Sequence, residues 1–318
     1  MSVLHLREAD VAQLLDMSTT IEVVEEAFRQ LAAGHAHNVP RQRARGKGIV
    51  LHSMSAAADY LGLVGWKQYT TTSSGAKFLV GLYEQSAGNL VALIEADRLG
   101  QMRTGAVTGI AARWLANPDA DQVGLFGSGW QAESQLEAVA TTCPIKRAFV
   151  YSRDADRRSS FAARMTERLG FEVITAAEPR RAVESLPIVI TATTSRTPVF
   201  DGEWLSAGTL VCAVGSNWQN KTEIDATTVR RSSIVVCDSV ECCQHEAGDF
   251  NEAIAAGQFS WDSARELSEV LLGTSAGRGG PDDIILFKSV GMAIEDVAVG
   301  ARLVELARTR GVGSILPI

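Results

Sequence analysis

The fold is decided by the stretch Val123-Gly124-Leu125-Phe126-Gly127-Ser128-Gly129-Trp130-Gln131-Ala132. A short apolar run ends in a glycine turn, and an amphipathic segment over residues 133–142 follows at once. This order predicts a strand, a tight turn and the start of a helix. Gly127, Gly129 and Ala132 then occupy the three positions of the dinucleotide-binding fingerprint.

Each small residue of this turn has a physical role. Gly127 permits the tight turn, Gly129 lets backbone N–H groups approach a pyrophosphate, and Ala132 lets the helix pack closely on the strand. The helix start adds N–H donors and a positive dipole end. A plain strand–turn–helix connection can look similar, but a second apolar strand over residues 147–152 follows at the spacing of a βαβ unit. We therefore predict a dinucleotide site.

The bulk properties exclude several classes of protein. The 318 residues are enough for two domains, and 46% hydrophobic with 21% charged residues is ordinary for a globular protein. A net charge of −7 and no basic stripe argue against a nucleic-acid partner. The apolar runs are only of strand length and the N-terminus lacks a signal-peptide pattern, so we expect no membrane association. Five cysteines without framework spacing favour a cytoplasmic location.

The remaining sequence divides into two kinds of pattern. The first part predicts a helix over residues 8–33, with a new start near residue 18. Strands are predicted over 49–52, 61–72, 78–84 and 90–95, and a second helix over 98–116. Asn117-Pro118-Asp119 ends that helix and marks a domain boundary. Strands then alternate with helices, as in a parallel sheet, with strands at 123–126, 147–151, 188–193, 210–214, 233–237 and 284–287, and helices at 131–142, 155–168, 222–230 and 291–310.

The end of the second strand of the dinucleotide unit indicates which cofactor binds. NAD enzymes usually place an acidic residue there, whereas arginines accept the 2′-phosphate of NADP. Here Ser152 and Arg153 occupy the position, Asp154 is expected to cap the next helix, and Arg157 follows. These arginines could also form a solvated helix start. We predict that NADP(H) is favoured over NAD(H).

Further cofactor contacts are expected at the carboxyl ends of later strands, where ligands bind in open parallel sheets. Thr193 and Thr194 follow one apolar strand, and Val214 and Gly215 follow the next.

Two basic residues are candidates for substrate binding. Lys67 lies in a strand otherwise poor in charge, where loss of solvation would lower its pKa and allow proton exchange with a reacting group. A lysine that reaches solvent at a sheet edge is the alternative. Arg103 opens a helix of small residues that leave space for a bidentate grip on a carboxylate, although a surface ion pair would look the same in sequence.

The chain resembles the ornithine cyclodeaminase/μ-crystallin family over essentially its whole length. The matching segments are Arg103-Thr104-Gly105-Ala106, Gly127 to Ala132, Val214-Gly215-Ser216-Asn217, Lys221-Thr222-Glu223 and Phe287-Lys288-Ser289-Val290-Gly291. The resemblance implies an α/β protein with a Rossmann domain over residues 118–300. It also implies a discontinuous α+β substrate-binding and dimerisation domain, formed by residues 1–117 and 301–318, and a homodimer.

The resemblance also implies roles for individual residues. Lys67 would bind substrate, and Arg103 would hold its carboxylate together with a second arginine after the first helix. Arg41 and Arg43 are the candidates and lie on the same face of an extended segment; we favour Arg41 slightly. Ser289 would reach the nicotinamide unless it is a helix cap. The matched segments add Arg103, Thr104, Ser128, Trp130, Gln131 and Ser216 to the predicted cofactor contacts.

Asn217 departs from the cyclodeaminase pattern, which has an acid/base aspartate at this position. An amide does not exchange protons near neutral pH, so Asn217 could orient substrate or nicotinamide but not carry a proton. The resemblance then favours reduction of a C=N bond in an α-imino acid, such as pyrroline-2-carboxylate or piperideine-2-carboxylate, to the L-amino acid, with Lys67 as proton donor.

Three alternative functions remain: an alanine dehydrogenase-like amino-acid dehydrogenase, an ornithine cyclodeaminase, and a non-catalytic NADPH-dependent carrier of a small ligand. Cys237, Cys242, Cys243 and His245 cluster in the sequence but lack CxxC spacing, so we predict no metal site.

Overall fold

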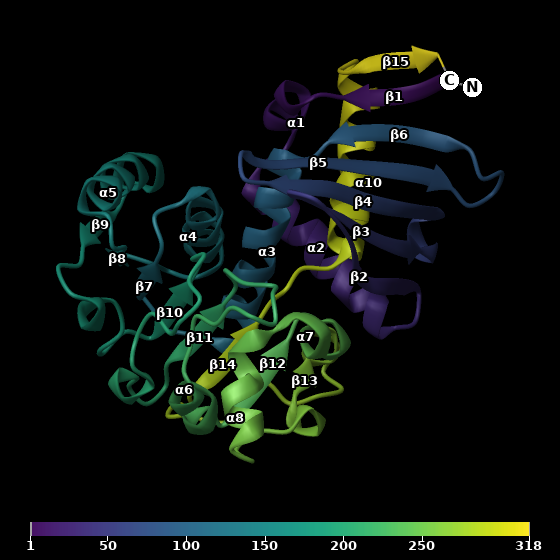
Figure 1. Cartoon of the computed structure of the whole chain (residues 1–318). Coiled ribbons are helices and arrows are strands. Elements are labelled where there is room, and N and C mark those ends of the chain that lie inside the picture. Colours follow the sequence, from purple (N-terminus) through teal and green to yellow (C-terminus); the bar gives the residue numbers. More distant parts are fainter. Residues whose placement is uncertain (1, 318) are drawn as a thin grey trace. The chain divides into compact units, whose positions relative to one another are not determined.

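The computed structural model describes residues 2–317, and the chain forms two compact units (Figure 1). Unit 1 combines the N-terminal segment up to Arg103 with the C-terminal segment from Gly291, and unit 2 is Thr104–Val290. These divisions differ from the predicted ones at residues 117/118 and 300/301. The breaker Asn117-Pro118 ends helix α3 (Asp97–Leu115), but the division between units lies inside that helix.

Unit 1 is built on a seven-stranded sheet of order β15-β1-β6-β5-β4-β3-β2. Its strands are β1 (Ser2–Leu6), β2 (Ala36–Gly46), β3 (Ile49–Ala58), β4 (Leu63–Thr72), β5 (Gly75–Glu84), β6 (Leu90–Glu95) and β15 (Ser314–Pro317). All neighbours pair antiparallel except β1 and β6, which are parallel. The pairing of β15 with β1 confirms that the C-terminal tail returns to the N-terminal block.

Helices cover one face of this sheet (Figure 1). α10 (Ala293–Arg310) lies across β3, β4 and β5 and also contacts α2 (Met17–Ala32). The predicted helix over residues 8–33 is divided into α1 (Glu8–Leu14) and α2, because Asp16 caps α2 by accepting a hydrogen bond from the Thr19 N–H. Apolar side chains of the sheet and of α10, among them Val80, Ile94 and Val297, form the core of the unit.

Unit 2 has an eight-stranded parallel sheet of order β13-β12-β14-β11-β10-β7-β8-β9. Its strands are β7 (Gln122–Phe126), β8 (Arg147–Tyr151), β9 (Glu172–Thr175), β10 (Ile188–Thr191), β11 (Leu210–Ala213), β12 (Ile234–Cys237), β13 (Arg265–Glu266) and β14 (Ile285–Lys288). From β9 to β11 the order is that of the Rossmann fold, with β14 next to β11 in the sixth place, and the order reverses between β7 and β10. The predicted Rossmann domain is confirmed.

The helices of unit 2 connect these strands. They are α4 (Trp130–Thr142), α5 (Ala155–Leu169), α6 (Ala226–Arg231), α7 (Val240–Glu246), α8 (Asn251–Ala255) and α9 (Leu267–Leu272). The helix predicted to start at residue 222 starts at Ala226, because the Asp225 carboxylate caps it at the Thr228 N–H. Residues 222 and 223 instead belong to a buried polar network.

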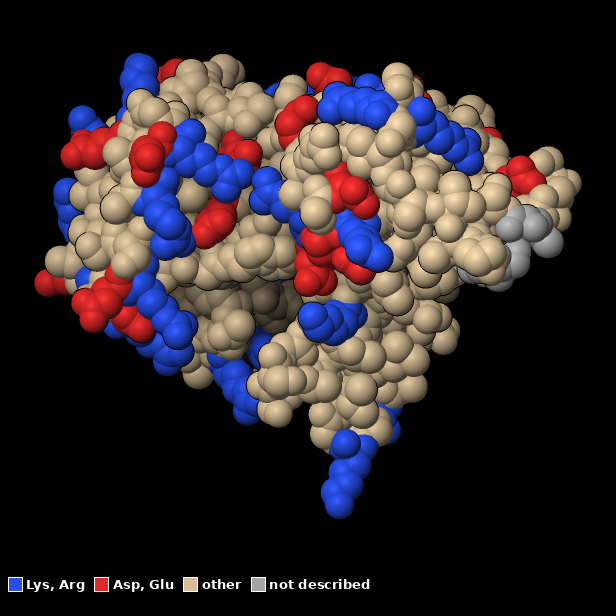
Figure 2. Space-filling model, turned by 90° about the horizontal axis from the view of Figure 1, so that it is seen from above, with Lys and Arg blue, Asp and Glu red and all other residues tan. Residues whose placement is uncertain are grey.

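Charged residues are mixed on the surface. Figure 2 shows a face on which acidic and basic side chains lie in small groups between uncharged ones. Within residues 2–317, no helix has the length and apolar character needed to cross a bilayer.

Candidate active site

The glycine turn of unit 2 lies between β7 and α4, as predicted. Gly127 has φ +112°, and a Cβ there would overlap the Ala192 carbonyl, so only glycine fits. At Gly129, by contrast, no described atom lies within 4 Å of the position that a Cβ would take. Ala132 is fully buried at the start of α4. The turn therefore has the geometry that lets backbone N–H groups approach a phosphate.

A cavity of about 590 Å³ opens over this turn. It is lined by the carboxyl ends of β7, β8 and β10 and includes eight of the predicted cofactor contacts: Gly127, Ser128, Gly129, Ser152, Arg153, Arg157, Thr193 and Thr194. A hydrogen bond of 2.9 Å from the Ser128 hydroxyl to the Ser152 hydroxyl joins two of its walls. The position, at the reversal of strand order, is where Rossmann domains bind a dinucleotide.

The acidic residue that follows β8, Asp154, lines the cavity and also starts the next helix. Asp154 caps α5 through the Arg157 N–H at 3.0 Å, which confirms the predicted helix cap. Arg153 and Arg157 are exposed at the rim of the cavity, and the Arg157 side chain lies 3.4 Å from the Asp154 carboxylate.

A buried carboxylate, Glu223, organises the neighbouring strand ends. It accepts hydrogen bonds from the Thr193 N–H and hydroxyl, both at 2.7 Å, and from the Gly215 N–H at 2.6 Å. Burial raises its pKa, although Lys288 opposes the shift. Glu223 belongs to the matched segment Lys221-Thr222-Glu223, from which no role was predicted for it. The structure shows that it connects the loops after β10 and β11.

Other predicted contacts in unit 2 lie at the ends of β11 and β14. The Lys288 ammonium donates to the Ser216 carbonyl at 2.9 Å and pairs with Asp249 at 2.8 Å. The Ser289 hydroxyl donates to the Asp238 carboxylate at 2.8 Å, so it is positioned by a side chain rather than capping a helix. Val214, Gly215 and Asn217 belong to the loop after β11, and Thr104, Trp130 and Gln131 lie in α3 and α4.

The predicted substrate-binding residues of unit 1 come together in a buried cluster. The Lys67 ammonium lies 2.7 Å from Asp296 Oδ1, and the lysine is 1% exposed. Arg103 lies 2.7 Å from Glu295 and 3.3 Å from the same Asp296 oxygen. The strand β4, the helix α3 and the helix α10 each supply part of this cluster. Lys67 is therefore a buried cation and does not reach solvent.

Electrostatics give the two cations different properties. Burial and the neighbouring Arg103 lower the pKa of Lys67 to about 8, although Asp296 opposes them. Burial alone would also lower the pKa of Arg103, but Asp296 and Glu295 raise it above its ordinary value. Arg103 therefore remains charged, while Lys67 can gain and lose a proton near neutral pH.

Arg41, rather than Arg43, belongs to the cluster. Arg41 is buried, with its guanidinium 3.3 Å from the Met54 sulfur and 3.2 Å from the Gly291 carbonyl, and its charge acts on Lys67. Arg43 lies opposite His52 in the sheet register. Burial, then Arg43, lowers the pKa of His52 to about 4, so this histidine is neutral where it stacks on Tyr69.

Glu295 and Asp296, the carboxylates of this cluster, were not predicted as site residues from the sequence. A signal was available, because they are adjacent acidic residues at the start of a helix whose next residues, Val297 to Val299, are apolar. Such a position on a covered helix face requires partners of opposite charge.

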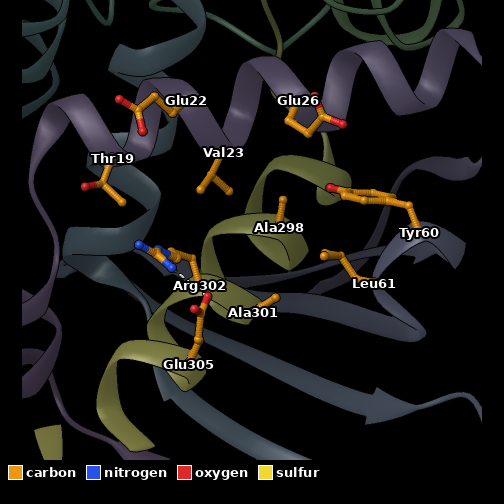
Figure 3. Close-up of a pocket in the computed structure, with 10 residues that line it drawn as sticks. All are labelled: Thr19, Glu22, Val23, Glu26, Tyr60, Leu61, Ala298, Ala301, Arg302 and Glu305. Carbon is orange, nitrogen blue, oxygen red and sulfur yellow. Dashed lines mark hydrogen bonds and ion pairs between the residues drawn. The ribbon is translucent and has the colours of Figure 1, made fainter. Parts of the chain in front are cut away.

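Unit 1 has a cavity of its own, of about 360 Å³, which is lined by none of the predicted site residues. Glu22 and Glu26 of α2 face Arg302 and Glu305 of α10 across it (Figure 3), and Arg302 pairs with Glu305 at 2.6 Å. Burial and then Glu26 raise the pKa of Tyr60 at its rim to about 12. Its acidic lining makes it unsuited to a carboxylate ligand.

No group of three or more metal-ligating side chains with suitable geometry occurs within residues 2–317. The five cysteines, including Cys237, Cys242 and Cys243, are free thiols.

A sequence model of the ornithine cyclodeaminase/mu-crystallin family matches residues 2–310. The chain belongs to this family. It is 29% identical to a delta(1)-pyrroline-2-carboxylate reductase of Bacillus cereus over 95% of each chain. It is 30% identical to an alanine dehydrogenase of Archaeoglobus fulgidus, over 99% of this chain and 98% of the relative.

A family member of known structure resembles the chain closely. It is the delta(1)-pyrroline-2-carboxylate reductase of Thermococcus litoralis in complex with NADH and L-proline, at a TM-score of 0.94 and 32% identity over 98% of this chain and 99% of that one. The family resemblance and the fold class predicted from sequence are both confirmed.

Proposed function

We propose that this chain is an NAD(P)H-dependent reductase of an α-imino acid, with a cyclic ketimine such as pyrroline-2-carboxylate or piperideine-2-carboxylate as substrate and the L-amino acid as product. The buried cluster around Lys67 carries the proposal. The relatives named delta(1)-pyrroline-2-carboxylate reductase support the proposal, since their names state a cyclic imine of this kind.

The charges of the cluster suit a monocarboxylate. Arg41, Lys67 and Arg103 bring three positive formal charges, and Glu295 and Asp296 bring two negative ones. The five side chains therefore carry an excess of one positive charge in a buried environment, which a substrate carboxylate would balance. Arginine guanidinium groups bind such a carboxylate through paired N–H donors.

Lys67 supplies the proton that the reaction needs. When bound, the nicotinamide cofactor supplies a hydride to the imine carbon. The imine nitrogen then gains a proton, and the C=N bond becomes a CH–NH bond. With a pKa of about 8, the Lys67 ammonium is protonated at neutral pH and acidic enough to give its proton up. The amide of Asn217 does not exchange protons near neutral pH, so we do not assign Asn217 as the proton donor.

The dinucleotide would occupy the cavity over the glycine turn, with its pyrophosphate at Gly127 to Gly129. We propose NADP(H) as the favoured form, since Arg153 and Arg157 line this cavity and Asp154 is engaged at the start of α5. Replacement of both arginines by alanine should raise the Kd for NADPH about tenfold and leave the Kd for NADH unchanged. An equal loss for both cofactors would refute this preference.

We further propose a homodimer through the face of the unit 1 sheet that α10 does not cover. Alternation along β3, β4 and β5 places Leu51, Val64 and Leu79 on this face, and each is more than a third exposed. Large apolar side chains exposed on a sheet face are typical of a protein–protein interface.

Replacement of Lys67 tests the mechanism. Lys67→Ala should lower turnover with a cyclic imine by about a hundredfold or more while NADPH still binds. Lys47→Ala, at an exposed lysine in the turn after β2, is the matched control and should keep full activity. Full turnover in the Lys67 variant would rule out this proton donor.

A further inference from the structure

We propose that the adjacent carboxylates Asp296 and Glu295 are positioning residues with different tasks at the two cations Lys67 and Arg103. Asp296 holds Lys67 in place and keeps it protonated, and Glu295 fixes the direction of Arg103. The inference rests on the proposed reductase function and adds two residues that were not among the candidates predicted from sequence.

Glu295 is itself fixed at two points. One oxygen accepts a hydrogen bond from the Met292 N–H at 2.9 Å, at the start of α10, and the other contacts Arg103 at 2.7 Å. The carboxylate therefore connects the guanidinium directly to the backbone of a helix. Gly291, just before this helix, has φ +82°, and a Cβ there would overlap the Arg103 guanidinium. Arg103 is thus confined by a carboxylate and by a glycine.

Asp296 serves both cations with a single oxygen. Oδ1 lies 2.7 Å from the Lys67 ammonium and 3.3 Å from Arg103 Nε. Oδ2 is buried and has no hydrogen-bond partner among the described residues. A fully buried carboxylate is costly unless it is paired, so this position indicates a carboxylate kept for its charge at Lys67 and Arg103.

The charged groups around Lys67 explain what Asp296 contributes. Arg103 of α3 and Arg41 of β2 oppose the ammonium charge, and burial opposes it further. Asp296 of α10 favours it, while Glu295 acts at Arg103 and the nearby His52 is neutral. Without the charge of Asp296, Lys67 would be a buried cation among cations and would lose its proton at lower pH.

The pH dependence of imine reduction tests this assignment. A proton donor is active while protonated, so kcat/KM should fall as the pH rises through the pKa of Lys67. In Asp296→Asn the midpoint of this alkaline fall should move at least about one pH unit lower, and Asp296→Glu should restore it in part. Glu295→Gln should instead raise the KM for the imino acid about tenfold and leave the midpoint in place.

The protonation of Lys67 can also be followed without any turnover. The chain has six lysines, so the signal of isotopically labelled Lys67 can be assigned by NMR through its loss in Lys67→Gln. Its titration midpoint should fall in Asp296→Asn relative to the wild type. The NMR titration separates the role of Asp296 from the proposed reductase function, because a protein that reduces no imine can still show a lower Lys67 midpoint in Asp296→Asn.

Three results would overturn the inference. The first is an Asp296→Asn variant that loses activity equally at all pH values, with an unchanged Lys67 titration. The second, if that variant does not fold, is an Asp296→Glu variant whose midpoint falls by a full pH unit or more although it keeps the charge. The third is a Glu295→Gln variant with an unchanged KM.

Discussion

At the scale of single residues, the two glycines of the dinucleotide turn look equivalent in sequence but differ in what surrounds them. Gly127 has a positive φ and is packed against the Ala192 carbonyl, whereas no described atom lies near the position of a Cβ at Gly129. One glycine is therefore required by the fold. The other leaves open space, where we propose that the pyrophosphate binds.

The two substitutions should consequently have different effects. Gly127→Ala should lower the free energy of unfolding of the protein by more than about 1 kcal/mol, because alanine is strained at positive φ. Gly129→Ala should leave stability unchanged and raise the Kd for NADPH roughly tenfold, a loss of about 1.4 kcal/mol. Thermal unfolding and fluorescence titration with NADPH measure the two effects. Equal cofactor affinity in Gly129→Ala and wild type would contradict the phosphate assignment.

Lys67 gives the site its predicted pH dependence. Its pKa is lowered to about 8, so the ammonium form is lost as the pH rises through this value. We expect kcat/KM for imine reduction to be constant below pH 7 and to decrease about tenfold for each unit above pH 8. A Lys67→Arg variant, whose guanidinium does not give up its proton, should be slow at every pH and should lack this decrease. A profile that is flat to pH 10 in the wild type would contradict the role of Lys67.

The cations of the site can be predicted from the sequence, but their carboxylate partners cannot be paired with them. Lys67 and Arg103 stand out because a charge in an apolar strand and an arginine among small residues are visible locally. Asp296 pairs with Lys67 across 229 positions of sequence, and no local pattern shows such a pair. Arg41 and Arg43 looked alike for the same reason, because only the fold shows that Arg41 is near Gly291.

At the scale of elements, the small residues of α3 make room for neighbouring groups. A Cβ at Gly100 would lie 2.9 Å from the Lys67 ammonium, and one at Gly105 would overlap the Ser134 carbonyl of α4. The glycines of this helix thus serve the site in unit 1 and the helix packing in unit 2.

Gly100→Ala should therefore lower activity although alanine normally favours a helix by about 1 kcal/mol. We expect kcat with a cyclic imine to fall about tenfold because the added methyl group displaces Lys67. Gly300→Ala in α10, where the new Cβ would approach apolar side chains at 3.3 Å or more, is the control and should stay close to wild-type activity. Unchanged kcat in Gly100→Ala would show that Lys67 tolerates displacement.

The strands that were not predicted lack an apolar run. β9 (Glu172–Thr175) has only two apolar residues, and β13 consists of Arg265 and Glu266 alone. β2 contains Pro40 and several basic residues, a composition tolerated at the edge of a sheet, where β2 lies. The short apolar strands of unit 2 and the glycine turn, by contrast, were predicted close to their observed bounds, whereas the strand predicted over residues 49–52 extends to Ala58 in β3.

At the scale of the whole molecule, the exposed apolar face of unit 1 predicts self-association. Val64 and Leu79 are 36% and 40% exposed on this face. Val64→Glu combined with Leu79→Glu should convert a dimer to a monomer, because the charges would be buried without partners. Ile254→Glu in unit 2, where the isoleucine is 39% exposed, is the control and should leave the mass unchanged. Sedimentation velocity distinguishes the outcomes, and a monomeric wild type would contradict the prediction.

The discontinuous architecture could be predicted only through the family resemblance. A helix breaker such as Asn117-Pro118 is visible in sequence, but the division between units lies earlier in α3 and depends on contacts far apart in the chain. The return of the C-terminal strand to β1 is likewise a long-range pairing without a local signal.

The most direct test of the proposed function is oxidation of NADPH and NADH by the wild-type protein with a panel of substrates. The panel contains pyrroline-2-carboxylate, piperideine-2-carboxylate and pyruvate with ammonia, and ornithine with NAD is assayed separately for ammonia release. We predict rapid cofactor oxidation with one cyclic imine, one L-amino acid formed per cofactor oxidised, and no ammonia from ornithine. Cofactor binding without oxidation by any imine would contradict the account, as would ammonia release from ornithine.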